Sequence, residues 1–456
     1  MLLFQVDEAV NISRNEPPLP PESLYCDIYH NTPPQYTFHT LLHRSLTAQS
    51  IHHELEASFQ TQPFKLHRLD AGPSRDTILT KSDALEMYKQ MQLIRRTEQS
   101  SDLLYKDRKV RGFCHLYAGQ EACAVGIFAA KDPKDAIITS YRCHAFAMME
   151  RNVREVLSEL LGRSHGNVKR KGGSMHMYAK NFYGGNGIVS AQIPLGAGIA
   201  FAMKYNRKPN LCFTLYGDGA ANQGQLFEDN LQILGDIKSL EKTWRVRKIF
   251  HVHTVTFTSI DIISAANMCA LWRLPCVFIC ENNDYGMGTP TSRSSASTKY
   301  FTRGDYIPGI WVNAMDALAV RESIKFARKY CVTDGKGPLF IEFATYRFYG
   351  HSVSDPGTSY RTREEVQEIR KTSDPILLLK DKILTSKLAM KDELRKIENQ
   401  AKQEVDAAVK FAKNGPVIST DALLTDIYHN TPPIIVRGHT IDETKVQPYT
   451  RTSDII

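Results

Sequence analysis

Three short apolar runs constrain the fold of this chain more than any other feature of its sequence. They occupy residues 211–216, 274–280 and 338–348, and each is followed by glycine or asparagine, either directly or one residue later. The segments between them carry apolar residues at helical spacing. Short runs of this kind are typical of parallel strands that are buried on both faces. We therefore predict an α/β fold, with a parallel sheet that is covered by helices on both faces.

Two stretches on either side of these runs have the spacing and the start signals of amphipathic helices. Residues 80–109 place apolar side chains at helical intervals behind Thr80, a good N-cap residue. Beyond Thr362, a second cap candidate, the chain reads as two or three amphipathic helices that end at Gly415.

The two ends of the chain lack this regularity. We expect one α/β domain over residues 63–415, an atypical N-terminal extension over residues 1–62 and a C-terminal tail over residues 416–456. The octapeptide DIYHNTPP occurs both at 27–34 and at 426–433. Because an exact repeat of this length does not arise readily by chance, the extension is either a duplicated binding segment or a fused copy of a tail.

Charge and cysteine usage narrow the class of protein. The net charge of +8 comes from Lys and Arg scattered among acidic residues, so no nucleic-acid partner is expected. The nine cysteines form no CxxC pair, which favours reduced thiols inside a cell. No apolar stretch approaches the roughly 20 residues that a spanning helix requires, so no membrane span is expected.

Asp218 stands between two glycines directly after the first apolar run. Ligands of open α/β sheets bind at the carboxyl ends of the strands, and glycine allows the backbone to come close to them. The residues that follow can begin a helix, whose free N–H groups favour an anion. Gly-Asp-Gly is also a common turn sequence, so this triplet alone does not decide between a turn and a site.

The other two runs end in further polar side chains. Asn283 and Tyr285 follow the second run, and His351 follows the third. Carboxylate, amide and backbone carbonyl oxygens are hard donors of the kind that Mg²⁺ accepts, with water and phosphate oxygens completing its octahedron. The three strand ends together therefore predict a site for a magnesium diphosphate.

Long blocks around these residues resemble one family. YGDGAANQGQLFE at 216–228 and ENNDYGMGT at 281–289 are similar to the thiamine-diphosphate motif. RGFCHLYAGQEA at 111–122, KGGSMHMYAKNFYGGNGIV at 171–189 and HSVSDPGTSYRTREEVQEIR at 351–370 extend the likeness. The chain thus resembles the alpha subunits of thiamine-diphosphate-dependent 2-oxo acid dehydrogenases, and within them the pyruvate dehydrogenases (acetyl-transferring). The resemblance implies the thiamine-diphosphate-binding fold.

The resemblance also implies roles for individual residues. The catalytic histidines of the family fall on His351 and His115, although a lone histidine such as His115 is as easily explained as a structural residue. The Mg²⁺ ligands fall on Asp218, Asn283 and the carbonyl of Tyr285. Arg142 is expected to fork onto phosphate oxygens. The full set of implied cofactor contacts is Tyr141, Arg142, Gly187, Val189, Asp218, Gly219, Ala220, Asn283 and His351.

The activity implied by the resemblance is the decarboxylation of pyruvate. The two-carbon unit passes to lipoyl groups on a partner acyltransferase and yields acetyl-CoA. In this family a beta subunit supplies the glutamate that contacts the cofactor, so we expect an α₂β₂ heterotetramer that is inactive without it. The resemblance places the protein in the mitochondrial matrix, and residues 36–53, which lack acids, weakly resemble a transit peptide.

Two serines match positions that regulatory kinases and phosphatases of this family modify. Ser352 adjoins His351, and Ser359 precedes an arginine-containing turn. A phosphate adds nearly two negative charges, which would repel a diphosphate and disorder the loop.

One segment departs from the family pattern. The Gly-Asp-Gly and Asn-Asn segments are usually joined by about 30 residues, the length of one crossover helix. Here the excess lies in residues 229–264, which we expect to interrupt that helix. A surface insertion is cheap in loop entropy and would leave the site intact. The alternative is that this stretch does not belong to the mature protein.

Two other functions remain open at this point. A branched-chain 2-oxo acid dehydrogenase alpha subunit would use the same chemistry on a different substrate. A non-catalytic assembly or regulatory paralogue would bind the beta subunit without the cofactor, and the insertion favours that reading.

Overall fold

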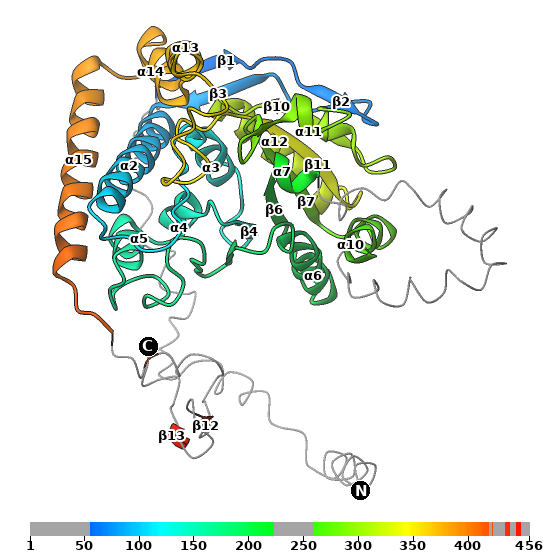
Figure 1. The fold of residues 1–456 in the computed structure, drawn as a ribbon. Coiled ribbons are helices and arrows are strands. Elements are labelled where there is room, and N and C mark those ends of the chain that lie inside the picture. The colour runs from blue at the N-terminus through cyan, green and yellow to red at the C-terminus, as the bar shows by residue number, and fades with distance from the viewer. Residues whose placement is uncertain (1–54, 223–259, 419–421, 423–433, 438–443, 448–456) are drawn as a thin grey trace, which may run out of the picture. The chain divides into compact units, whose positions relative to one another are not determined.

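The computed structural model describes residues 55–222, 260–418, 422, 434–437 and 444–447. Its centre is a seven-stranded sheet, in which neighbouring strands run parallel except at one edge (Figure 1). The predicted parallel α/β sheet is therefore confirmed. The strand order is β2 (Lys65–His67), β10 (Gly309–Asn313), β11 (Leu339–Ala344), β7 (Cys276–Asn282), β6 (Cys212–Gly217), β4 (Ala136–Ser140) and β5 (Phe182–Asn186), with β2 antiparallel to β10.

Both faces of the sheet are covered by helices. Alternate residues of a strand point to opposite sides, so one strand contributes to both cores. Phe213 and Leu215 of β6 belong to a core shared with α2 (Lys81–Lys106), α3 (Glu121–Phe128) and α12 (Ala317–Arg328). Cys212 and Tyr216 belong to a second core, shared with α6 (Gln192–Tyr205) and α10 (Ile260–Leu271). The sheet is thus the middle layer of three.

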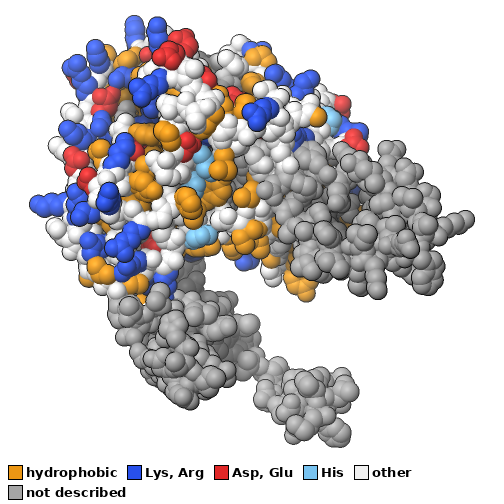
Figure 2. All heavy atoms as spheres, in the orientation of Figure 1, with side chains coloured by type: hydrophobic (Ala, Val, Ile, Leu, Met, Phe, Trp, Pro, Cys, Tyr) orange, Lys and Arg blue, Asp and Glu red, His pale blue; other side chains and the backbone are white. Residues whose placement is uncertain are grey.

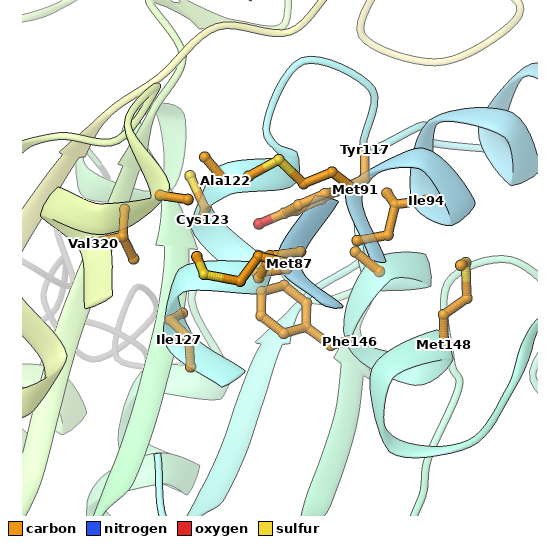
Figure 3. Close-up of a cluster of buried hydrophobic side chains, with 14 of the residues drawn as sticks. Met87, Met91, Ile94, Tyr117, Ala122, Cys123, Ile127, Phe146, Met148 and Val320 are labelled. Atoms are coloured by element: carbon orange, nitrogen blue, oxygen red, sulfur yellow. The ribbon is translucent and has the colours of Figure 1, made fainter. Parts of the chain in front are cut away.

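The first core is packed closely. Figure 3 shows side chains from α2, α3, α4 (His144–Glu150) and α12 pointing toward one another. A Cβ atom on Gly126 of α3 would lie 2.5 Å from Cβ of Val320 on α12, so only glycine lets these helices approach this far. Helix α3 is thereby held against α12, with Gln120 at its N-terminus.

The predicted caps and C-terminal helices are present. The Thr80 hydroxyl accepts the N–H of Asp83 at 3.2 Å, and the Thr362 hydroxyl accepts the N–H of Glu365 at 3.1 Å. Beyond Thr362 lie α13 (Arg363–Ser373), α14 (Pro375–Thr385) and α15 (Lys391–Asn414), with Gly415 as the last cap. Helix α15 packs along α2 and α5 (Val153–Leu160) (Figure 1).

The remaining elements are short. They are β1 (Glu56–Gln60), β3 (Asp76–Thr80), α7 (Asp218–Ala221), β8 (Tyr285–Gly286), β9 (Thr289–Pro290), α11 (Thr291–Ser294), η3 (Tyr300–Thr302), η4 (Lys329–Thr333), β12 (Ile434–Arg437) and β13 (Thr444–Gln447). None of the described helices is long and apolar enough to cross a membrane. The eight described cysteines are all buried and unbridged.

Several boundaries differ from the sequence prediction. Strand β1 pairs with β3, and Phe59 packs on the first core, so the domain begins before residue 63. The third apolar run leaves the sheet after Ala344 rather than at residue 348. Helix α10 begins at Ile260, inside the stretch that was expected to be an insertion.

Some sequence predictions concern residues outside the described part of the chain. Both copies of the octapeptide, the transit-like residues 36–53 and residues 229–259 of the expected insertion are among them. The helix predicted to follow Gly219 is described only as the single turn α7.

Candidate functional site

One cavity of about 980 Å³ opens at the carboxyl ends of β4, β6, β7 and β11. In Figure 2, histidine side chains lie among hydrophobic ones near the middle of the face in view. The cavity gathers nearly all of the residues singled out from the sequence, whereas Ser359 is exposed and does not line it. The lining includes His115, Tyr141, Arg142, Gly187, Val189, Asp218, Gly219, Ala220, Asn283, Tyr285, His351 and Ser352.

Asp218 begins α7 at the tip of β6, and it is 1% exposed. One carboxylate oxygen, Oδ1, accepts the backbone N–H of Asn283 at 3.4 Å, but the other, Oδ2, has no hydrogen-bond partner among the described residues. Burial raises the pKa of Asp218 to about 6, against the opposing charge of Arg347. A buried carboxylate oxygen without a partner is costly, so this atom is a natural ligand for a cation.

Glycines bring two backbone segments together beside Asp218. A Cβ atom on Gly219 would lie 3.1 Å from Cα of Gly286, the second residue of β8. On the opposite side, a Cβ atom on Gly187 would lie 2.9 Å from the ring of His176. Larger residues would crowd these neighbours, so glycine allows the tip of β6 to approach β8 and Gly187 to approach His176.

Asn283 and Tyr285, the other predicted Mg²⁺ ligands, have oxygens that already accept hydrogen bonds. Nη1 of Arg347 donates to Oδ1 of Asn283 at 3.0 Å and to the carbonyl of Tyr285 at 2.5 Å. Nδ2 of Asn283 donates to Oε1 of Gln120 at 3.1 Å. The ligand oxygens are thus fixed in position by a network that the sequence did not reveal.

The two predicted catalytic histidines lie in contact. The ring centroids of His115 and His351 are 5.1 Å apart, and the Tyr141 ring lies 4.4 Å from that of His115, tilted by 42°. Burial and the charge of Arg142 lower the pKa of His115 to about 2 and that of His351 to about 4. Both rings are therefore neutral near pH 7.

Arg142 has a different set of partners from the one expected. Its terminal nitrogens donate to the carbonyls of Leu116 at 2.6 Å and His351 at 2.9 Å. It therefore ties together the two segments that carry the histidines. Three of its five N–H donors remain for other acceptors, so contact with a phosphate stays a prediction.

The loop after β11 is organised around Asp355. Its Oδ2 accepts the N–H of His351 and the hydroxyl of Tyr360, each at 2.6 Å. Burial opposes ionisation of Asp355, but the Tyr360 and backbone hydrogen bonds outweigh it and lower the pKa. Ser352 is buried, with its hydroxyl 2.8 Å from that of Ser354, whereas Ser359 is exposed.

Gln120, Glu281 and Arg347 are among the side chains of the cavity wall that the sequence interpretation missed. Glu281 is buried beside Asn282 and receives hydrogen bonds from the hydroxyl of Tyr117 and, at 3.4 Å, from Nε2 of Gln120. Burial raises its pKa to about 7. Gln120 and Glu281 stand inside quoted motif blocks, so their polar character within apolar surroundings was the available signal.

The donor set fits a cation that is completed by a phosphate. No group of three or more His, Cys, Asp and Glu side chains in the described part of the chain could hold a metal by itself. Asp218 instead offers one free carboxylate oxygen, and Asn283 and Tyr285 offer neutral oxygens beside it. Mg²⁺ typically takes one or two carboxylates and obtains further ligands from substrate phosphates and water.

Comparisons with known proteins agree with this geometry. A family described as "Dehydrogenase E1 component" matches residues 89–231 and 259–420. The chain is 54% identical over 420 residues to "Probable pyruvate dehydrogenase E1 component subunit alpha, mitochondrial" of Caenorhabditis elegans, covering 91% of this chain and 96% of that protein. It is 52% identical over 390 residues to the somatic, mitochondrial alpha subunit of pyruvate dehydrogenase from Bos taurus, covering 85% and 90%.

Proposed function

Because the chain belongs to the dehydrogenase E1 component family, we propose that it is the alpha subunit of the decarboxylating component of the pyruvate dehydrogenase complex. The observation that carries this function is identity above half over nearly the full length of alpha subunits that are named for it. Those proteins are named mitochondrial, and we infer the mitochondrial matrix for this chain as well.

The cofactor that belongs to this function is thiamine diphosphate, with Mg²⁺ as its companion. Bound thiamine diphosphate supplies the carbon nucleophile for decarboxylation of a 2-oxo acid. Asp218, Asn283 and the Tyr285 carbonyl would hold Mg²⁺, and the unpartnered Oδ2 of Asp218 supports this assignment. Gly219 and Ala220 would present backbone N–H groups at the start of α7. The other predicted contacts line the same cavity.

His115 and His351 have the properties required of groups beside a reacting 2-oxo acid. Since both rings are neutral near pH 7, each can donate one hydrogen bond and accept another without adding charge. Arg142 holds the segments of both, and burial of His115 keeps bulk water away. We assign them to orienting the substrate carboxylate and carbonyl and to moving protons at the ring nitrogens.

The chain works with partners. It forms a complex with a beta subunit and delivers its two-carbon unit to a lipoyl-bearing acyltransferase, as its family membership implies. We assign the assembly as α₂β₂. A regulatory kinase and phosphatase would act at Ser352 and Ser359. Ser352 is buried in the Asp355-centred loop and lines the cavity, which supports a disruptive effect of phosphate there, because the added negative charge would stand beside the site proposed for a diphosphate.

A co-expressed alpha and beta pair tests the function directly. Turnover would be measured with pyruvate and with branched-chain 2-oxo acids, in the presence and absence of thiamine diphosphate and Mg²⁺. We expect cofactor-dependent turnover that strongly favours pyruvate. A preference for branched-chain acids would make this chain the alpha subunit of the branched-chain enzyme. An assembled complex without turnover would indicate the non-catalytic paralogue. The family does not match residues 232–258, and this unmatched segment favours that alternative.

A further inference from the structure

Arg347 is the largest fully buried side chain of the described residues, at 1% exposure. It lies three residues beyond the end of β11. Nη1 donates to the side chain of Asn283 and the carbonyl of Tyr285, and Nη2 donates to the carbonyl of Met287 and the Tyr360 hydroxyl. The guanidinium therefore faces oxygens that converge on one point of the cavity wall.

The surroundings of Arg347 differ from those of an ordinary buried arginine. Within the described residues it forms no salt bridge, and its acceptors are all uncharged. Burial of a cation without a paired carboxylate is costly. The charge of Arg347 favours the ionised form of Asp218 from a distance, but no described carboxylate forms an ion pair with it, so the geometry that the fork imposes on its acceptors is the feature that needs explaining.

The Asn283 amide is held from both ends. Its oxygen accepts Nη1 of Arg347 at 3.0 Å, and its nitrogen donates to Oε1 of Gln120 at 3.1 Å. A flip of this amide, which would exchange its oxygen and its nitrogen, would lose both hydrogen bonds. An amide oxygen and a backbone carbonyl oxygen each have two lone pairs. Arg347 uses one on Asn283 and one on Tyr285, which leaves one on each for a further ligand.

We propose that Arg347 and Gln120 are positioning residues for the divalent cation: they preorganise the oxygens of Asn283 and Tyr285 beside Asp218. This inference rests on the proposed function, because the cation is the Mg²⁺ that accompanies thiamine diphosphate. Neither residue touches the cation. Their contribution is to fix the rotamer of one ligand and the backbone of the other, as outer-shell partners do in metal sites.

Two physical effects of Arg347 oppose each other. Its fork orders the ligand oxygens and favours cation binding, whereas its charge repels a second cation nearby. Arg347→Lys separates them, because lysine keeps the charge but loses the planar fork. The proposal requires that ordering outweighs repulsion, so this variant must bind the cation more weakly than the wild type.

The test measures Mg²⁺ rather than turnover. Wild type, Arg347→Lys and Gln120→Met would each be co-expressed with the beta subunit. Binding of thiamine diphosphate would be followed by equilibrium dialysis while Mg²⁺ is titrated. We expect Arg347→Lys to raise the half-saturating Mg²⁺ concentration about 10- to 100-fold, which is the usual cost of losing an outer-shell partner. Gln120→Met should raise it in the same direction, and excess Mg²⁺ should largely restore kcat in both.

Arg321→Lys is the matched control. Arg321 is also buried and donates to the Thr77 hydroxyl and the Ile78 carbonyl, but it does not line the cavity. Its variant should lose thermal stability and keep the wild-type Mg²⁺ dependence. If Arg347→Lys behaves like this control, Arg347 is only structural and the proposal is wrong.

Two further outcomes are distinguishable. If Arg347→Lys does not assemble, Gln120→Met decides, and an unchanged half-saturation in that variant overturns the proposal. If the wild-type pair binds thiamine diphosphate without any need for Mg²⁺, the proposed cation site itself is wrong, together with the inference built on it.

Discussion

Asp218 is a single residue whose burial lowers the stability of the fold. It is buried, one of its oxygens has no partner, and burial raises its pKa to about 6. An isolated buried charge destabilises a native state unless a ligand compensates for it. Gly-Asp-Gly at the end of an apolar run, together with the polar ends of the two other runs, was enough to predict where this residue lies, because the chemistry and the strand ends coincide in sequence.

Replacing Asp218 tests this cost. We expect Asp218→Asn to abolish the rise in melting temperature that thiamine diphosphate and Mg²⁺ give the assembled enzyme. In the absence of both, the variant should be as stable as the wild type or more so, since it loses an uncompensated charge. Differential scanning calorimetry with and without the cofactor pair measures both effects. A cofactor-dependent shift that survives the substitution would contradict the assignment.

His115 gives a prediction for pH. Its folded-state pKa is about 2, whereas an unfolded chain has a histidine pKa of about 6.5. Below pH 6.5 the unfolded state therefore binds a proton that the folded state does not bind. The contribution of His115 to the free energy of unfolding thus falls as the pH falls, and it is constant above pH 6.5. The slope from one such histidine is at most about 1.4 kcal/mol per pH unit.

We expect His115→Gln to flatten this dependence. Between pH 6.5 and 5 its melting temperature should fall less steeply than that of the wild type. His165→Gln, at an exposed histidine outside the cavity, is the control and should leave the slope unchanged. Equal slopes for wild type and His115→Gln would show that His115 is protonated in the folded state.

Arg347 shows what single residues could not reveal. It stands within the third apolar run, and the sequence analysis gave it no role. Its partners are carbonyls of the segment after β7, about 60 residues earlier in the chain. Only the fold brings these backbone oxygens to a side chain so distant in sequence, and no pattern of side chains in the sequence predicts such a contact. Asp218 was predictable because its chemistry and its strand end coincide in the sequence, whereas the role of Arg347 depends on contacts that only the fold creates.

At the scale of elements, the caps follow the sequence closely. Thr362 begins α13, and the N–H it accepts belongs to Glu365, whose carboxylate accepts the hydroxyls of Tyr285 and Tyr346. Loss of a threonine cap costs about 1 kcal/mol. We expect Thr362→Ala to lower stability by about this amount in urea unfolding, and Thr362→Ser to retain most of it. Equal losses in both variants would mean that the methyl group matters rather than the oxygen.

Strands and helices with a strong period were predicted, and weakly patterned ones were not. β6 and β7 are continuous apolar runs, and α2 carries a long helical repeat. β1 is only EASFQ, within a polar extension, and it exists because β3 pairs with it and Phe59 reaches the core. Tertiary contacts decide such short elements, so local pattern cannot.

The connection between β6 and β7 gives an element-scale prediction. The family matches both of its sides and leaves residues 232–258 unmatched, while α10 already covers the sheet from Ile260 onward. A variant without 232–258, co-expressed with the beta subunit, should decarboxylate pyruvate at least as fast as the full chain. Loss of activity on shortening, with the full chain active, would show that this segment is required.

At the scale of the whole molecule, the chain presents a cavity that holds the proposed cation ligands and two histidines. Exposed apolar side chains, including Phe113 and Met287, line its wall. The acid that contacts the cofactor is expected from the beta subunit. We predict that the purified chain alone shows no turnover of pyruvate and that adding purified beta subunit restores it. Rates would be followed by release of carbon dioxide. Full turnover without the partner would refute the shared site.

The cavity also lies at the ends of two neighbouring strands that are far apart in sequence. Asp218 stands at the tip of β6 and Asn283 just beyond β7, and residues 218–275 separate these two neighbouring strands in sequence. Parallel pairing over so long a connection requires closure of a large loop, which slows folding. We therefore expect the pairing of β6 with β7, and with it the proposed cation site, to form late in folding, which pulsed hydrogen exchange during refolding would measure.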